Sequence, residues 1–213
     1  MAEDFDRQFW EDRYRHRSTT HRHPNPQLVA EVADLRPGRA LDAGCGEGGD
    51  ALWLAGHGWT VTAVDIAEEA LGRARALGES AGADVAHRID WVRADLTTWN
   101  SPRSDYDLVT SHYVHAPGPR EDLLRRLADA VAPGGTLLVV GHDCVTVGHD
   151  HAGHAHPGDR SAPESRVTAD DLAASLKPGR WDIVVAESRT RTATGHGRDE
   201  VLHDTVLRAT RRP

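Results

Sequence analysis

Residues 40–50, which read ALDAGCGEGGD, constrain the fold of this chain more than any other stretch. Small and apolar residues lead into Asp42, and four glycines then fall within six positions: Gly44, Gly46, Gly48 and Gly49. Glycine lets the backbone bend sharply and lets a ligand approach, because it has no Cβ. The DALWLA that follows is typical of a helix, whose first N–H groups are open to an acceptor. The stretch therefore predicts a buried strand, a tight turn and a helix that together bind a nucleotide-type cofactor.

Apolar and β-branched runs alternate with amphipathic stretches along most of the chain. We expect strands over residues 39–43, 59–65, 86–93, 106–110, 136–141, 181–187 and 201–210. We expect helices from Asn25-Pro26, from Gly48 or Gly49, over residues 67–80 and 119–132, and after Thr168. A polar turn containing Gly195 and Gly197 joins the last two strands.

The order of these elements sets the fold class. Strands that alternate with helices through five units predict a parallel sheet covered by helices on both faces. Two late strands without a helix between them predict an antiparallel hairpin at one edge. The fold class is therefore α/β, a Rossmann-like three-layer sandwich with a seven-stranded, mostly parallel sheet and a C-terminal antiparallel hairpin.

Length and composition favour a single domain over residues 1–213 that acts on small molecules. The chain has 213 residues, of which 38% are hydrophobic and 27% charged. Its formal net charge of −8 argues against nucleic acid as a partner. No apolar run reaches a membrane span, and the acidic, aromatic N-terminus lacks a signal-peptide pattern. We expect a cytoplasmic protein with a small-molecule substrate and no membrane partner, either a monomer or a homodimer.

Two acidic residues narrow the type of cofactor. Gly44, Gly46 and Gly49 satisfy GxGxxG, a pattern that alone would suit a dinucleotide. Asp42, however, stands two residues before the first of these glycines, where a carboxylate suits a cationic ligand better than a pyrophosphate. Asp65 ends the next expected strand, and the hairpin at the end of the chain is absent from the dinucleotide fold.

At this point the chain resembles the class I S-adenosylmethionine-dependent methyltransferases over nearly its whole length. The resemblance rests on five motifs: LDAGCGEGGD, VDIA at residues 64–67, RADL at 93–96, YDLVTSHYVH at 106–115 and APGGTLLVV at 132–140. The small size, WEDRY at residues 10–14 and NPQL at residues 25–28 resemble the tellurite-resistance and thiopurine methyltransferase group of small bacterial enzymes. That group implies a soft or small acceptor such as a thiol or a metalloid anion.

The resemblance implies a cofactor, S-adenosyl-L-methionine, which leaves as S-adenosyl-L-homocysteine, and a role for each matching residue. Asp42 would take the ammonium end, and the backbone around Gly44, Cys45 and Gly46 would carry the amino-acid tail. Asp65 would accept from the ribose hydroxyls and Ile66 would pack on the adenine. Asp95 and the Leu96 N–H would bind the adenine edge. Ser111, which follows the fourth strand on the substrate side, would also contact the cofactor. A role for Asp42, Asp65 and Asp95 as turn or helix-capping acids remains open.

His112 and His115 are the candidate catalytic residues, because either imidazole could deprotonate a thiol, phenol or amine. They could equally shape the pocket.

We also expect an N-terminal helix within residues 1–24, either packed on the domain or acting as a flap. A histidine-rich loop over residues 142–166 is either a lid or a metal site, although its spacings match no zinc signature. The alternatives are thus a metal-binding protein or a non-methylating cofactor-dependent enzyme on this fold.

Overall fold

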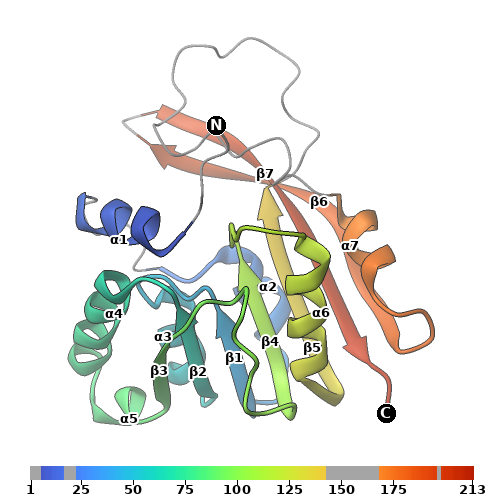
Figure 1. Ribbon diagram of the computed structural model, residues 1–213, viewed down its shortest axis with the longest axis horizontal. Coiled ribbons are helices and arrows are strands. Elements are labelled where there is room, and N and C mark those ends of the chain that lie inside the picture. The colour runs from blue at the N-terminus through green and yellow to red at the C-terminus, as the bar shows by residue number, and fades with distance from the viewer. Residues whose placement is uncertain (1–5, 17–22, 143–167, 196–197) are drawn as a thin grey trace.

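The chain folds around one seven-stranded sheet (Figure 1). The structure, a computed structural model, describes residues 6–16, 23–142, 168–195 and 198–213. The strands are β1 (Arg39–Ala43), β2 (Thr60–Asp65), β3 (Ile89–Arg93), β4 (Tyr106–His112), β5 (Val131–His142), β6 (Trp181–Gly195) and β7 (Arg198–Arg211). The helices are α1 (Arg7–His16), α2 (Pro26–Val32), α3 (Gly49–Gly56), α4 (Glu68–Ser80), α5 (Ala83–Ala86), α6 (Arg120–Ala130) and α7 (Ala169–Ser175).

The strand order β3-β2-β1-β4-β5-β7-β6 confirms the predicted fold class. Strands β1 to β5 pair in parallel, while β7 is antiparallel to both β5 and β6. Because the order reverses between β2-β1 and β4, the carboxyl ends of β1 and β4 flank the switch point at which open α/β sheets bind ligands. The β6–β7 hairpin extends past the rest of the sheet at this same edge (Figure 1).

Several element boundaries differ from the prediction. The fifth strand, expected over residues 136–141, runs from Val131 to His142, so the helix before it ends at Ala130. The third strand, expected over residues 86–93, begins at Ile89, because the preceding residues form the short helix α5 after Gly82, whose φ is 106°. The last two strands are much longer than expected and pair from Trp181 with Arg211 to Gly195 with Arg198. The sequence of residues 188–200 is polar and gives no hydrophobic signal for strands, so the predicted polar turn was too long.

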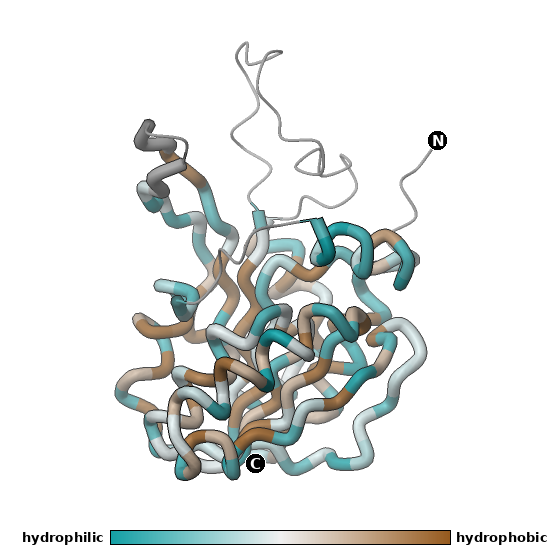
Figure 2. The backbone as a smooth tube through the Cα atoms, turned by 90° about the vertical axis from the view of Figure 1, so that its left-hand side faces the viewer, coloured by the Kyte–Doolittle hydropathy of each residue, from teal (hydrophilic) through white to brown (hydrophobic). Residues whose placement is uncertain are grey.

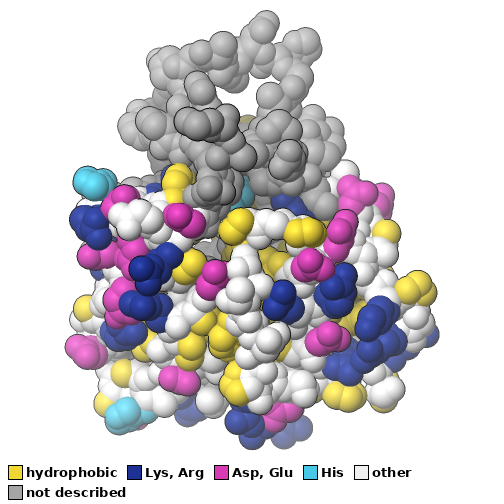
Figure 3. All heavy atoms as spheres, in the orientation of Figure 1, with side chains coloured by type: hydrophobic (Ala, Val, Ile, Leu, Met, Phe, Trp, Pro, Cys, Tyr) yellow, Lys and Arg dark blue, Asp and Glu magenta, His cyan; other side chains and the backbone are white. Residues whose placement is uncertain are grey.

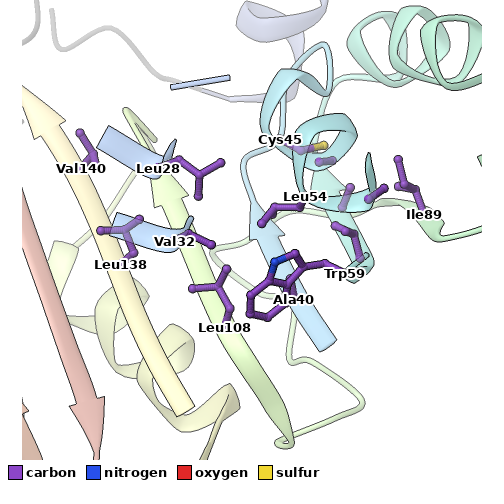
Figure 4. Packing of buried hydrophobic residues seen from close by; sticks show 14 of the residues in the cluster. Leu28, Val32, Ala40, Cys45, Leu54, Trp59, Ile89, Leu108, Leu138 and Val140 are labelled. Carbon is purple, nitrogen blue, oxygen red and sulfur yellow. The ribbon is translucent and has the colours of Figure 1, made fainter. Parts of the chain in front are cut away.

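Helices cover both faces of the sheet, and each face has its own apolar core. Leu28 and Val32 of α2 and Leu54 of α3 pack on the face that carries Ala40 and Leu108 (Figure 4). Residues of α6 and α7 cover the opposite face, where Leu41 and Val109 lie. Neighbouring residues of β1 and β4 thus point to opposite cores, as the two-residue period of a strand requires.

Helix α1 is different, since it lies at the carboxyl edge of the sheet, next to α4 (Figure 1), and has no buried residue. Figure 2 shows it as largely hydrophilic, in contrast to the hydrophobic strands of the interior. Acidic and basic side chains are interspersed over the face seen in Figure 3. Among the described residues, no helix is long and apolar enough to cross a membrane.

Candidate active site

A cavity of about 530 Å³ opens at the carboxyl edge of the sheet. Its walls come from the glycine loop after β1, the end of β2, the segments after β3 and β4, and helix α1, with Arg191 of β6 on one side. This position and size are typical of a small-molecule site in an α/β protein.

The glycine loop lies against the cavity because its backbone adopts left-handed conformations. Gly44 has φ 82°, and a Cβ there would come within 2.2 Å of the Val114 side chain. Gly46 has φ 53°, and a Cβ there would lie 2.9 Å from the Tyr14 hydroxyl oxygen. Side chains at these positions would therefore strain the backbone and collide with the walls of the cavity.

The buried carboxylate of Asp42 lies beneath this loop and is only 1% exposed. The Thr110 hydroxyl donates to its Oδ1 (3.3 Å), whereas its Oδ2 has no hydrogen-bond partner among the described residues. Burial raises the pKa of Asp42 to about 7, and the nearby carboxylate of Asp50 adds to that rise. A buried carboxylate oxygen without a donor fits a cationic ligand at this position, although Asp42 itself does not line the cavity.

The other predicted cofactor residues meet at the cavity wall. Those that line it are Gly44, Cys45, Gly46, Asp65, Ile66, Asp95 and Leu96. Asp65 accepts from the backbone N–H groups of Gly46 (2.8 Å) and Ala67 (2.9 Å). Asp95 accepts from the backbone and the hydroxyl of Thr97. Asp65 and Asp95 thus stabilise turns and also line the cavity. A structural role as turn acids is therefore compatible with a role in binding the cofactor.

Ser111, the remaining predicted cofactor residue, is not part of this group. Its side chain is buried and lines a separate, smaller cavity together with residues of α6. Successive residues of β4 alternate between the sheet faces, so Ser111 and His112 point in opposite directions.

The two candidate catalytic histidines have different surroundings. Nδ1 of His112 lies 2.6 Å from Oδ2 of Asp50, at the start of α3, and the other oxygen of Asp50 accepts the backbone N–H of Asn25 (2.6 Å). An ionised carboxylate only accepts, which places a hydrogen on Nδ1. Nε2 of His112 is buried and has no hydrogen-bond partner among the described residues. Burial lowers the pKa of His112, but the carboxylates of Asp50, Asp42 and Asp204 together outweigh burial, and the net direction is upward.

His115 instead belongs to a row of roughly parallel rings. Its imidazole stacks between Trp10 (6.4 Å between centroids) and His142 (5.9 Å), and His142 stacks on Tyr113 (4.7 Å). All four rings line the cavity. Because their faces are turned toward one another, the ring edges form this part of the wall.

Tyr113 is held in an unusual conformation by a polar network. It has φ 53°, which is the one positive value among the described non-glycine residues. Its backbone N–H donates to the carbonyl of Val140 (2.8 Å) and its hydroxyl donates to Oδ1 of Asp204 (2.8 Å). The left-handed conformation costs a non-glycine residue about 1 kcal/mol, and strain of this kind gathers at functional sites.

Helix α1 forms the roof of the cavity through specific contacts rather than apolar packing. The carboxylate of Glu11 accepts the backbone N–H groups of Glu68 (2.9 Å) and Glu69 (3.1 Å), and so caps α4. Arg73 of α4 donates to the carbonyl of Tyr14 (2.7 Å) and to the buried carboxylate of Glu47 (2.7 Å). Trp10, Arg13 and Tyr14 line the cavity. Helix α1 is thus packed on α4 and also lies over the cavity, as both interpretations of the N-terminal helix require.

Several residues of the site were not among the predicted ones, notably Asp50, Arg191 and Asp204. Asp50 carried a signal, since it directly follows the glycine loop at a helix start, where an acid also has a structural role. Arg191 and Asp204 reach the site only through the pairing of β6 with β7.

The histidine-rich loop lies outside the described residues, apart from His142. Within the described ranges, no group of three or more His, Cys, Asp or Glu side chains could hold a metal ion.

Comparisons with known proteins agree with this architecture. Residues 40–135 match the family described as "Methyltransferase domain". The trans-aconitate 2-methyltransferase of Streptomyces avermitilis is 36% identical over 136 residues, which make up 60% of this chain and 49% of that protein. The chain thus spans about half the length of this curated relative.

Solved structures share the fold across most of the chain at low sequence identity. A structure described as "Conversion of a Disulfide Bond into a Thioacetal Group during Echinomycin Biosynthesis" has a TM-score of 0.73 at 23% identity, covering 96% of this chain and 91% of the other. TehB from Haemophilus influenzae has 0.67 at 18% identity, covering 96% and 67%. The glycopeptide N-methyltransferase MtfA, solved with S-adenosylmethionine, has 0.64 at 17% identity, covering 90% and 88%.

These structural likenesses concern the fold, and the resemblance to the tellurite-resistance group remains a resemblance. The domain match falls on the glycine loop, β2, β3 and β4, which supply most of the cavity wall. The matched domain and the curated relatives are those of methyltransferases, and the fold is shared with a structure solved with S-adenosylmethionine, so the chain is similar to the class I S-adenosylmethionine-dependent methyltransferases.

Proposed function

We propose that this protein transfers the methyl group of S-adenosylmethionine to a small-molecule acceptor that loses a proton during the reaction. The proposal rests chiefly on one arrangement, in which the cofactor-type residues and the His112–Asp50 pair converge on a single cavity. The position of this cavity beneath α1 and its volume of about 530 Å³ favour an acceptor of small size over a macromolecule.

The cofactor end of the cavity fits a cationic, ribose-bearing ligand. Asp42 offers a buried carboxylate oxygen that has no donor among the described residues, as an ammonium group requires. Gly44 and Gly46 keep the loop free of side chains where the amino-acid tail would lie. Asp65 and Ile66 would hold the ribose and the adenine, and Asp95 and Leu96 the adenine edge. The Cys45 thiol has a pKa raised by burial, so only its backbone would contribute.

When bound, S-adenosylmethionine supplies a methyl group attached to a positively charged sulfur, which a nucleophile attacks in line. The protein's task is to hold the nucleophile close and aligned and to keep water away. The roof formed by α1 serves the second purpose, because Glu11 and Arg73 fix it over the glycine loop.

His112 is the better candidate for the base that takes the acceptor's proton. Asp50 orients its ring and leaves Nε2 as the atom available to the acceptor. His115 lies in a ring stack with Trp10 and His142, so we assign it to the wall. A base favours a thiol, phenol or other hydroxyl acceptor over a metalloid anion, which carries no proton that must be removed.

An acceptor screen tests this function. Purified protein would be incubated with S-adenosylmethionine and with thiols, phenols, hydroxy acids, amines, halides and metalloid anions, and release of S-adenosylhomocysteine would be measured. We expect turnover with a proton-bearing acceptor and a loss of roughly a hundredfold or more in His112→Ala. His57→Ala, on the exposed end of α3, is the matched control. Cofactor binding without transfer to any acceptor class would contradict the proposal, as would full activity of His112→Ala.

A further inference from the structure

Arg191 of β6 carries a positive charge on the wall of the cavity. Its side chain is 25% exposed and lines the cavity beside Tyr113 and His142. Nε of Arg191 donates to Oδ2 of Asp204 (2.9 Å). The guanidinium is also hydrogen-bonded to the Tyr113 side chain. Because a guanidinium has five N–H donors in a planar fork, these two partners leave further N–H groups for another acceptor.

The position of Arg191 is fixed by a buried network centred on Asp204. That carboxylate is fully buried and also accepts from the Tyr113 hydroxyl (2.8 Å) and from Nε2 of Gln27 (3.1 Å). The guanidinium lies over the ring of Tyr113, 5.6 Å from its centroid. Asp204 is absent from the cavity wall, so a ligand would meet the guanidinium of Arg191 rather than the carboxylate behind it.

The strained backbone of Tyr113 supports a functional role for this network. A tyrosine at φ 53° persists only where surrounding contacts hold it. Here the strain brings one aromatic ring against both Arg191 and His142.

Besides Arg13 of α1, the cavity wall carries two groups of polar side chains. The carboxylates of Glu47, Asp65 and Asp95 follow β1, β2 and β3, at the cofactor end. Arg191, His112 and His142 come from β6, β4 and β5, across the switch point of the sheet. Asp50, the carboxylate between these groups, is hydrogen-bonded to His112. The acceptor end therefore presents N–H donors, and one of its side chains is permanently cationic.

We propose that Arg191 binds a carboxylate group of the acceptor, so that the methyl acceptor is a small organic acid that also carries the hydroxyl or thiol facing His112. This inference rests on the proposed function, since it names the substrate class of the same site. A guanidinium can hold a carboxylate through two parallel N–H···O bonds, which fixes both the position and the orientation of the rest of the molecule. Arg191 then acts as a specificity-determining residue for the transfer.

The test uses binding, so that it does not depend on turnover. Full-chain protein would first be titrated with S-adenosylhomocysteine by calorimetry. The loaded protein would then be titrated with two matched pairs of probes: para-hydroxybenzoate with para-hydroxybenzamide, and beta-mercaptopropionate with its amide. The variants are Arg191→Gln, Arg191→Lys, and the control Arg125→Gln, whose side chain is 57% exposed on α6. Circular dichroism and the unfolding midpoint establish that each variant is folded.

We expect wild type and Arg125→Gln to bind at least one acid roughly tenfold or more tightly than its amide. Arg191→Gln should lose that preference. Arg191→Lys keeps the charge beside Asp204 but lacks the fork, so it should retain only part of the preference. A purely structural Arg191 predicts the same preference in Arg191→Lys as in wild type, which would overturn the proposal.

Other outcomes separate this inference from the proposed function. Binding of S-adenosylhomocysteine with no acid preference, or with no probe bound, overturns the carboxylate site and leaves the cofactor assignment intact. An acid preference that depends on Arg191 in a protein that binds no cofactor supports the carboxylate site and contradicts the proposed function. Displacement of the acid by an equal concentration of sulfate would reveal a general anion site and overturn the assignment to an organic acid.

Discussion

Nδ1 of His112 and Oδ2 of Asp50 lie 2.6 Å apart, although 62 residues separate them in the chain. Asp50 opens the helix that follows the glycine loop, and His112 ends the strand on the other side of the switch point. The pair therefore couples the cofactor loop to the acceptor side of the cavity, and its chemistry can be tested through pH.

Replacing Asp50 by Asn should lower the pKa of His112, because Asp50 is the group that chiefly raises it. The other charged groups that face His112 are Asp42 of β1 and Asp204 of β7, which remain and also favour the imidazolium. Because the neutral imidazole is the base, activity should rise with pH through the pKa of His112. A lower pKa in Asp50→Asn should therefore shift this rise of the pH–activity profile to lower pH. We expect kcat to fall by roughly 10²-fold. An acidic limb at the wild-type position would show that Asp50 does not tune His112.

The raised pKa of Asp42 predicts how stability depends on pH. Its folded-state pKa of about 7 lies above the ordinary aspartate pKa of 3.8, so between these pH values the folded protein holds a proton that the unfolded chain has lost. The free energy of unfolding therefore falls as pH rises through this window. His112, whose pKa is also raised, contributes a fall in the same direction.

Asp42→Asn replaces the titrating carboxyl group by an amide that is neutral throughout this pH range, so the contribution of Asp42 to the pH dependence of stability is lost. Without bound cofactor, it should raise the free energy of unfolding at pH 8 by roughly 1–3 kcal/mol relative to wild type, with little change at pH 4. It should also weaken S-adenosylmethionine binding, because the ammonium group loses its carboxylate. Urea unfolding at the two pH values measures the first effect and calorimetry the second; a variant less stable than wild type at pH 8 would argue against a buried, unpaired charge.

The contact between Glu11 and the N-terminus of α4 predicts that the roof can be loosened without unfolding the domain. Glu11→Ala removes the acceptor for two backbone N–H groups, while α1 contributes no buried residue to the core. We expect cofactor affinity to fall by roughly tenfold and the free energy of unfolding to change by about 1 kcal/mol or less. Asp12→Ala, in the same helix and paired only with neighbours such as Arg15, should leave affinity unchanged. Equal affinities for the two variants would contradict the role given to Glu11.

Two Gly→Ala substitutions should have opposite effects on stability. Gly46→Ala imposes a side chain at φ 53° and within 2.9 Å of the Tyr14 hydroxyl, so it should destabilise the protein by about 1–2 kcal/mol and weaken cofactor binding. Gly72→Ala lies in α4, where an added Cβ meets nothing within 4 Å, and should stabilise by about 0.5–1 kcal/mol. Thermal unfolding measures both, and a stabilising Gly46→Ala would contradict the geometry of the loop.

The sequence allowed most of the sheet to be predicted, because buried strands are apolar and end at glycine or an acid. Asp65 and Asp95, at or just after strand ends, could be placed on one cavity for the same reason: parallel strands share a carboxyl edge. Ser111 is the exception, since the alternation of β4 turns its side chain to the other face.

The acceptor end could not be predicted in the same way. Arg191 and Asp204 meet across an antiparallel pair in which Arg189, not Arg191, is the direct partner of Asp204. That register depends on where the hairpin turns, and a shift of one residue would move both side chains to the opposite face. The polar sequence of this hairpin carries no hydrophobic alternation from which the register could be read.

The cofactor assignment is the centre of this account, and calorimetric titration with S-adenosylmethionine tests it most directly. Asp65→Asn keeps the shape of the side chain that accepts the Gly46 and Ala67 N–H groups but removes the charge that would face the ribose hydroxyls. Asp90→Asn, exposed on β3, is the matched control. We predict one bound cofactor per chain in wild type and Asp90→Asn, and affinity lower by roughly tenfold or more in Asp65→Asn. No binding by wild type, or equal binding by all three proteins, would contradict the account.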